Sequence, residues 1–170
     1  MTDEILDIVD ENDRIIGTAT KSACHQNSNL IHHTVHFTLL DKLNNKILTT
    51  IRGVQKLHDA GKLCFLGEHI LSGETYEQAV VRGVMEELGF KPNVFINSGQ
   101  NIFYQGNQTE LVKFYVVDWN GESLNWDKNE IEEVRWVTIS ELLKLSPNYS
   151  EMMQYWINNT DWKSYILEKI

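Results

Sequence analysis

The chain has 170 residues with 42% hydrophobic content, which is enough to bury one sizeable core and too short for two full domains. Its formal net charge of −9 at pH 7 gives no basic surface for a nucleic acid polymer or an anionic membrane. The N-terminus lacks a basic segment followed by an apolar run, and no stretch of about 18 apolar residues occurs. We therefore expect a single domain over residues 1–170, in the cytoplasm and without a membrane partner.

The N-terminal residues predict a β-hairpin. Residues 5–9 and 14–18 have strand composition and flank the polar run 10–13. Aspartate and asparagine side chains in such a run bond to their own backbone and favour a turn. The expected hairpin covers about residues 4–19.

Alternating β-branched and aromatic residues predict further strands along the chain. Gly106 and Asn107 supply turn chemistry between two of them, and Gly67 lies between two short ones. The predicted strands are 32–40, 47–51, 62–66, 69–71, 94–104, 111–117 and 132–138.

Residues 76–88 carry the clearest helix signals. Thr75 and Gln78 have the spacing of a capping box, and Gly89 can adopt the left-handed conformation that ends a helix. An apolar stripe is expected to pack inwards, while Glu86 and Glu87 lie towards the other side. The stripe consists of Ala79, Val80, Val81, Val84, Met85 and Leu88.

The remaining elements favour an α/β fold. Helices are predicted at 140–145 and 150–157, separated by Pro147, within a helical region of about 140–170. Strands before and after a helix, with more helix at the C-terminus, fit a mixed sheet covered on both faces.

Glu86 and Glu87 are candidate metal ligands because adjacent carboxylates repel each other unless solvent or a cation offsets the repulsion. Hard divalent ions such as Mg²⁺ and Mn²⁺ take oxygen ligands from such pairs. A Glu-Glu pair without further context is more often part of a solvated helix surface, so the surrounding pattern decides.

The stretch 67–90, GEHILSGETYEQAVVRGVMEELGF, resembles the Nudix box, G-x5-E-x7-R-E-U-x-E-E-x-G-U, where U is aliphatic. Two positions depart from it. Glu68 stands where the box begins with glycine, and Gly83 stands where the box has its first helical glutamate, which binds metal or acts as general base in many Nudix hydrolases. The matching residues are Glu74, Arg82, Val84, Glu86, Glu87, Gly89 and Phe90.

This resemblance implies a Nudix-type α/β/α sandwich with a mixed sheet and an N-terminal β-hairpin. The chain would be one Nudix domain over 1–170, with the hairpin at 4–19, the box at about 67–90 and helices at about 140–170. In Nudix proteins the box arginine pairs with the first box glutamate, so Arg82 is expected to pair with Glu74 and support the site.

Three histidines extend the resemblance to one branch of the family. His25 and His32 are separated by six residues, and His69 precedes the box helix. Imidazoles with a carboxylate form a transition-metal ligand set, although scattered histidines are more often surface or hydrogen-bonded residues. The spacing is similar to isopentenyl diphosphate isomerase, an enzyme on the Nudix fold in which the corresponding histidines and two glutamates bind a divalent metal.

That branch also bears on the remaining candidates. Glu110 matches the second metal-binding glutamate of the isomerase, whereas Gln108 occupies the position of the first. Gly67 stands where the isomerase has its catalytic cysteine. Arg52 and Lys56 match an R-x3-K pair that the branch uses on a diphosphate, as the geometry of arginine and the charge of lysine suit.

The resemblance implies a metal-dependent hydrolase that cleaves a diphosphate linkage in a nucleoside diphosphate derivative or a related small molecule. The alternatives are an enzyme like isopentenyl diphosphate isomerase and a catalytically weak nucleotide-binding Nudix domain. The expected cofactor is Mg²⁺ or Mn²⁺, and a homo-oligomer stays open. The expected catalytic residues are Glu86, Glu87, Glu110 and Arg82, the substrate-binding residues are Arg52 and Lys56, and the metal ligands are Glu86, Glu87 and Glu110, with His25, His32 and His69 as further candidates.

Overall fold

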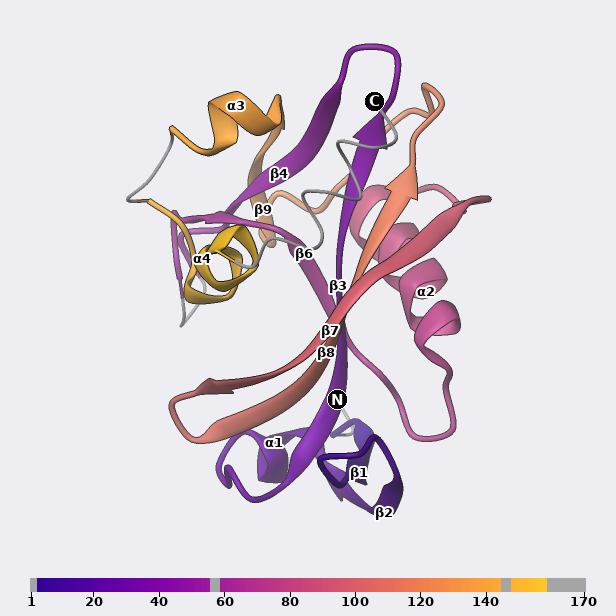
Figure 1. Ribbon diagram of the computed structural model, residues 1–170, viewed down its shortest axis with the longest axis vertical. Helices are drawn as coiled ribbons and strands as arrows, with labels where there is room; N and C mark the ends of the chain where they lie inside the picture. The colour runs from indigo at the N-terminus through magenta and orange to yellow at the C-terminus, as the bar shows by residue number, and fades with distance from the viewer. Residues whose placement is uncertain (1–2, 56–58, 145–147, 159–170) are drawn as a thin grey trace.

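The computed structural model describes residues 3–55, 59–144 and 148–158 (Figure 1). Lys56, Pro147 and the end of the predicted helical region at 159–170 lie outside the described residues. Among the described residues, no helix is long and apolar enough to cross a membrane.

Nine strands and four helices make up the described part of the chain. Most follow the predicted order, with the helix α1 as an addition. The elements are β1 (Ile5–Val9), β2 (Ile15–Thr20), α1 (Lys21–Cys24), β3 (Ile31–Asp41), β4 (Lys46–Arg52), β5 (Leu63–Cys64), β6 (Leu66–His69), α2 (Tyr76–Leu88), β7 (Phe95–Gln105), β8 (Gln108–Asp118), β9 (Ile131–Val137), α3 (Ile139–Leu142) and α4 (Glu151–Asn158).

Strand β3 is the centre of the sheet. It pairs with β1, β4 and β6 in antiparallel directions and with β8 in parallel. The outer strands attach to these neighbours, because β2 pairs with β1, β5 and β9 pair with β4, and β7 pairs with β8. The sheet is therefore mixed, as predicted.

Helices cover both faces of this sheet. On β8, Phe114 and Val116 pack in a core with residues of α4, whereas Tyr115 and Val117 pack in a second core with residues of α2. Neighbouring residues of a strand point to opposite faces, so one strand supplies both cores. Figure 1 shows α2 on one side of the sheet and α3 and α4 on the other. The α/β/α sandwich is confirmed.

Helix α2 has the predicted limits. Thr75 and Gln78 make both bonds of the capping box, and Gly89 ends the helix with φ of 79°. The buried side of the helix differs from the prediction, because Met85 is 49% exposed and Val81 is only half-buried. The predicted stripe was too wide: the buried positions are Ala79, Val80, Gly83, Val84 and Leu88.

Two local predictions were wrong, and one short helix was not predicted. The sequence suggested separate extended pieces on either side of Gly67, but β6 continues through this glycine because its backbone pairs with His36 of β3. The segment after β2 contains α1, which Thr20 caps by accepting a hydrogen bond from the backbone of Ala23. Helix α3 ends at Leu142 rather than 145.

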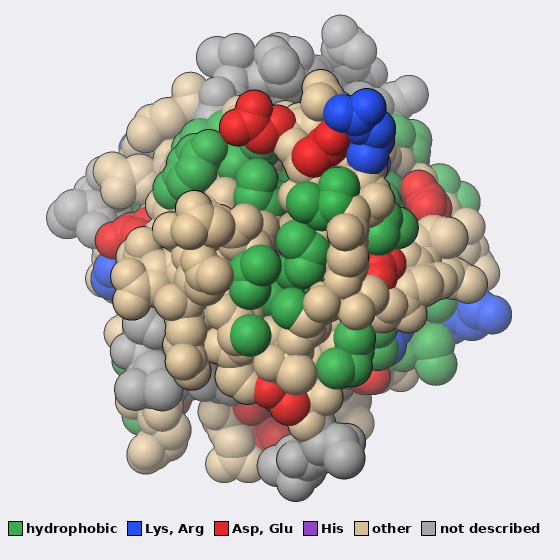
Figure 2. Space-filling view, turned by 90° about the horizontal axis from the view of Figure 1, so that it is seen from below, with side chains coloured by type: hydrophobic (Ala, Val, Ile, Leu, Met, Phe, Trp, Pro, Cys, Tyr) green, Lys and Arg blue, Asp and Glu red, His purple; other side chains and the backbone are tan. Residues whose placement is uncertain are grey.

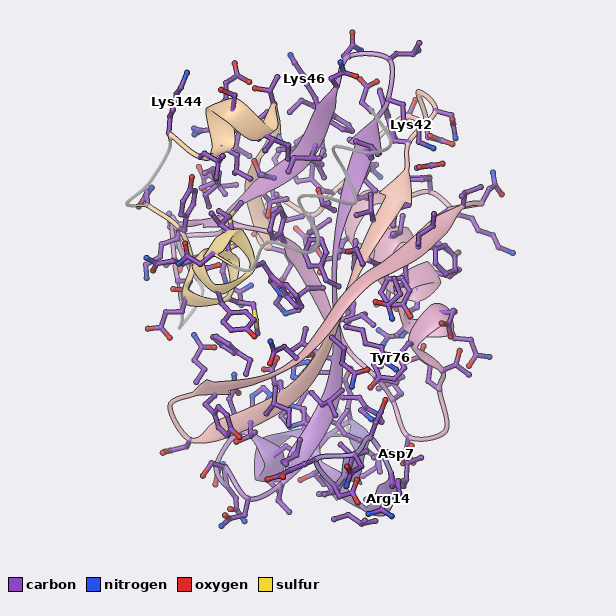
Figure 3. All side chains as sticks on the ribbon, viewed as in Figure 1. Asp7, Arg14, Lys42, Lys46, Tyr76 and Lys144 are labelled. Atoms are coloured by element: carbon purple, nitrogen blue, oxygen red, sulfur yellow. The ribbon has the colours of Figure 1, made fainter. Side chains whose placement is uncertain are left out.

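The N-terminal hairpin is fixed to the sheet through Asp13. One carboxylate oxygen lies 2.5 Å from His33 Nε2 and accepts a hydrogen bond from the Tyr76 hydroxyl at 3.0 Å. The other oxygen lies 3.0 Å from Lys113 Nζ. In Figure 3, Asp7 and Arg14 mark the hairpin, and Tyr76 lies at the end of α2 nearest to it. One side chain thus joins the hairpin to β3, α2 and β8.

The outer strand of the hairpin presents apolar side chains to solvent. Ile15 and Ile16 of β2 are 62% and 68% exposed. Figure 2 views this end of the molecule and shows hydrophobic side chains gathered in the middle of the face. The hairpin therefore buries only its inner side, where Leu6 and Ile8 of β1 pack against Cys24.

Replacing Asp13 with alanine should lower the free energy of unfolding by about 2 kcal/mol, because three partners lose a charged hydrogen-bond acceptor. Urea denaturation followed by circular dichroism measures the change. The matched control is Glu11→Ala in the same turn, where an exposed side chain should change stability by less than about 0.5 kcal/mol. Equal effects of the two substitutions would contradict the anchoring role of Asp13.

Candidate functional site

The site lies on the face of β3 that points away from α2. Successive residues of β3 point to opposite faces of the sheet. Val35 and Phe37 pack in the core with α2, so His32, Thr34 and His36 point the other way. Strand β8 places Glu110 opposite His32. Strand β6 places His69 opposite Thr34 and Gly67 opposite His36. The pairing of three strands thus gathers these polar side chains on one face.

All of these polar residues except His32 border a cavity of about 210 Å³. Its walls include His25, from the end of α1, and Arg52, the last residue of β4. Arg52, which was predicted to bind phosphate, therefore lines the cavity. Its predicted partner, Lys56, is outside the described residues. The cavity is also lined by Thr34, His36, Gly67, Glu68, His69, Gln108 and Glu110.

Three histidines from separate parts of the chain converge beside the cavity. One ligand atom from each of His25, His32 and His69 lies within 4.8 Å of the others. The Nε2 atoms of His25 and His69 are 2.9 Å apart, and the rings of His32 and His69 are stacked with centroids 5.4 Å apart. The structure therefore brings the three candidate histidines together.

The tautomer of His32 suits a metal ligand. Its Nδ1 lies 3.3 Å from the Leu30 carbonyl, which can only accept, so Nδ1 carries the proton and Nε2 presents its lone pair. Within the described residues, His32 Nε2 is buried without a hydrogen-bond partner. Burial lowers the pKa of His32 to about 4 and that of His69 well below its usual value. Both imidazoles are therefore neutral near pH 7, as ligation requires.

Glu110 is a buried carboxyl group at the same site. It accepts hydrogen bonds from Thr34 Oγ1 at 3.0 Å and from Gln108 Nε2 at 3.1 Å. Burial raises the pKa of Glu110 to about 7, and the hydrogen bond from Thr34 opposes this shift. Two polar neighbours hold the carboxyl group in place, and it can exchange a proton near neutral pH.

Arg82 links β6 to α2, and the predicted pair with Glu74 is confirmed. Its Nε and Nη2 each donate to one oxygen of the Glu74 carboxylate at 3.0 Å, and Nη2 also donates to the His69 carbonyl at 2.7 Å. Its Nη1 donates to Glu68 at 3.0 Å and to Glu86 at 3.2 Å. One guanidinium therefore fixes the backbone of His69 while holding three carboxylates.

The two box glutamates on α2 lie apart from the histidine cavity. The Glu86 side chain is 59% exposed and lies beside Val81 and Met85, in a separate groove of the helix surface. Glu87 is half-buried and borders neither cavity. Arg82 connects the two regions, because Glu86 and Glu68 both bind its Nη1 and Glu68 borders the histidine cavity.

Glu68 is a further candidate site residue. In the sequence it stands out only as a departure from the box pattern. Its side chain is 17% exposed and its pKa is raised by burial, with Arg82 opposing the shift and Glu86 adding to it. The stem of Glu68 lies against Gly83 of α2, where a Cβ atom would be 2.6 Å from Glu68 Cγ. The Glu68 side chain therefore occupies the space beside position 83.

His36 is the second missed residue. A Cβ atom at Gly67 would lie 2.9 Å from His36 Nε2, so the imidazole fills the space that a side chain at 67 would need. Burial, followed by the nearby charge of Arg52, lowers the pKa of His36 to about 4. The spacing of His32 and His36 on an alternating strand was a signal that both side chains share one face.

Known proteins resemble this chain in sequence and in fold. The family model for the NUDIX domain matches residues 32–156. An uncharacterized Nudix hydrolase from Nostoc is 31% identical over 147 residues, 83% of this chain and 84% of that protein. Isopentenyl-diphosphate Delta-isomerase 1 from Bos taurus is 30% identical over 166 residues, 84% of this chain and 72% of that protein. A crystal structure from Deinococcus radiodurans has a TM-score of 0.76 at 19% identity, covering 91% of this chain and 97% of that one.

Arg82→Lys should lower the free energy of unfolding by about 2 kcal/mol, because a single ammonium group cannot bind Glu74 through two atoms and also reach His69. Urea denaturation measures this loss. Arg135→Lys is the matched control, since Arg135 binds one exposed carboxylate, that of Glu133, and should change stability by less than about 0.5 kcal/mol. A loss no larger than the control's would show that Arg82 does not hold the site together.

Proposed function

Because this chain belongs to the Nudix family, we propose that it is a metal-dependent hydrolase that cleaves a diphosphate linkage in a nucleoside diphosphate derivative or a related small molecule. The observation that carries the proposal is the cavity that gathers Arg52, the histidine cluster and Glu110. A cation-binding ligand set and an arginine at one small cavity are what a diphosphate group requires.

The size of the cavity supports recognition of the diphosphate group. Its volume of about 210 Å³ is below the roughly 300–1,000 Å³ of sites that enclose a whole drug-sized ligand. The cavity therefore suits the diphosphate, while the remainder of the substrate lies outside. The other half of the substrate would then be selected by residues beyond the cavity walls.

The residues fit a divalent cation. His25, His32 and His69 would hold it through imidazole nitrogens, with Glu110 on the neighbouring strand as the oxygen ligand. Mn²⁺ accepts both donor types, whereas Mg²⁺ prefers oxygen ligands such as Glu86 and Glu87. When bound, such an ion neutralises charge on the phosphoryl group and lowers the pKa of a bound water.

The protein's own side chains supply the remaining functions. Arg52 would bind phosphate oxygens through two parallel hydrogen bonds. One oxygen of the Glu110 carboxylate would bind the cation, and the other would accept the proton of the attacking water. Arg82 holds the His69 backbone and Glu74 in place and so supports the site indirectly.

The first alternative is isomerisation of isopentenyl diphosphate, which the bovine relative's name suggests. Such a reaction needs a proton donor at the carbon skeleton, and the family places a cysteine for it at position 67. Here position 67 is glycine, and His36 Nε2 lies 2.9 Å from where its Cβ would be. Hydrolysis needs no such donor, so these residues favour hydrolysis.

Diphosphate hydrolysis is tested by incubating the full chain with nucleoside diphosphate derivatives, dinucleoside polyphosphates and isoprenoid diphosphates, with Mg²⁺ or Mn²⁺. We expect turnover of at least one class, and Glu110→Gln should reduce kcat/KM by about 100-fold, as for loss of one charge-stabilising group in the cavity. Glu132→Gln, at an exposed position of β9, is the control and should keep full activity. Thermal stabilisation by these compounds without turnover would instead identify a nucleotide-binding domain.

The isomerase alternative has its own measurement. Isopentenyl diphosphate incubated with the protein and Mn²⁺ in deuterium oxide should take up no deuterium, because Gly67 supplies no acidic proton. Nuclear magnetic resonance of the recovered compound detects exchange. Deuterium at the carbon skeleton, above a reaction without protein, would overturn the hydrolase assignment.

A further inference from the structure

The two departures from the box are reciprocal. The family pattern has glycine at the position of residue 68 and glutamate at the position of residue 83, whereas this chain has Glu68 and Gly83. Position 83 follows position 68 by 15 residues along the chain. Read separately, one change removes a carboxylate from α2 and the other adds a charge beside His69.

The structure places the two positions in contact. A Cβ atom at Gly83 would lie 2.6 Å from Glu68 Cγ and 2.9 Å from Phe37 Cε1. Phe37 belongs to the core beneath α2 and has no exposed surface, so it cannot move aside readily. Glutamate side chains at 68 and 83 would therefore compete for one space, and only one of them fits.

The carboxylate of Glu68 ends among the other carboxylates of the box. It lies 3.0 Å from Arg82 Nη1, which also binds Glu86 at 3.2 Å. Glu68 also borders the cavity that contains His69 and Glu110. Glu68 therefore lies between the box helix and the histidine cavity, with its carboxylate on the side of α2.

Pairing with Arg82 alone does not account for Glu68. The guanidinium already makes two bonds to Glu74 and one to the His69 carbonyl. One positive charge faces the carboxylates of Glu68, Glu74 and Glu86, all within 3.2 Å of its nitrogens. Lys21 adds only a weaker attraction to Glu68 and is itself paired with Glu4, so negative charge stays in excess here, and a divalent cation would offset it.

We propose that Glu68 supplies, from β6, the metal-binding carboxylate that the family pattern carries at position 83 of the helix. Glycine at position 83 leaves room for the Glu68 side chain. Relative to the family pattern, positions 68 and 83 have exchanged glycine and glutamate. The inference rests on the proposed function, because it assigns a ligand to an oxygen-bound cation at the box carboxylates, beside the cation that the histidines would hold.

The test measures Mg²⁺ binding to the full chain by isothermal titration calorimetry, with no substrate present. Mg²⁺ is the probe because it prefers oxygen ligands, so the histidine cluster contributes little to the signal. Glu68→Gln keeps the shape of the side chain and should weaken Mg²⁺ binding by about tenfold or more. Glu132→Gln removes an exposed charge on β9 and should leave binding unchanged.

The exchange itself is tested by two further variants. Gly83→Glu alone should weaken Mg²⁺ binding and lower the melting temperature, because its side chain collides with Glu68 and Phe37. The double variant Glu68→Gly with Gly83→Glu should bring the affinity for Mg²⁺ back to within about threefold of the original chain, as expected for two coupled positions. Its melting temperature should recover only in part, because the collision with Phe37 remains.

Three outcomes would overturn the proposal: no measurable Mg²⁺ binding by the original chain, unchanged binding by Glu68→Gln, or a double variant that binds no better than Gly83→Glu. Melting curves of every variant identify loss of binding through unfolding. Failure of the hydrolase assignment looks different, because the chain would then bind Mg²⁺ through Glu68 yet leave every diphosphate in the panel intact.

Discussion

The site depends on one guanidinium group. Arg82 lies between α2 and β6 and binds the side chain of Glu74 and the backbone carbonyl of His69 simultaneously. Arginine suits this position because its planar group carries donors in fixed directions and stays charged. Since His69 belongs both to this network and to the histidine cluster, the bond from Arg82 transmits the position of the helix to the cavity. The geometry of the histidine cluster is therefore set partly from the opposite face of the sheet.

Strand β3 serves the core and the cavity with alternate residues. Val35 and Phe37 pack against α2. On the opposite face of the strand, Thr34 and His36 line the cavity and His32 belongs to the histidine cluster. A strand held by four neighbours cannot shift its register without moving a polar side chain into the core. Packing on one side thus gives precise placement on the other. The buried, neutral histidines His32 and His69 are therefore held by strands whose positions are fixed by packing.

The sequence predicted what local signals encode. The limits of α2 follow from Thr75 and Gly89, which act within one turn of the helix. The path of β6 through Gly67 and the placement of His36 depend on pairing with a distant strand, which no local pattern contains. The contact between Glu68 and Gly83 could not be predicted for the same reason. In the sequence, each of the two residues is only a departure from the box pattern. The extent of a single domain over 1–170 and the roles of the site residues stay predictions.

The parallel pairing of β3 with β8 also bears on how the molecule assembles. Thr34 and Glu110, which share a hydrogen bond, are 76 residues apart along the chain. Contacts of such long sequence separation form only after the loss of chain entropy in closing the intervening loop, which slows folding. During synthesis, β3 can therefore pair with β8 only after β4 to β7 and α2 have emerged. The residues around the cavity therefore come together only after the hairpin and the helix beside them have been synthesised.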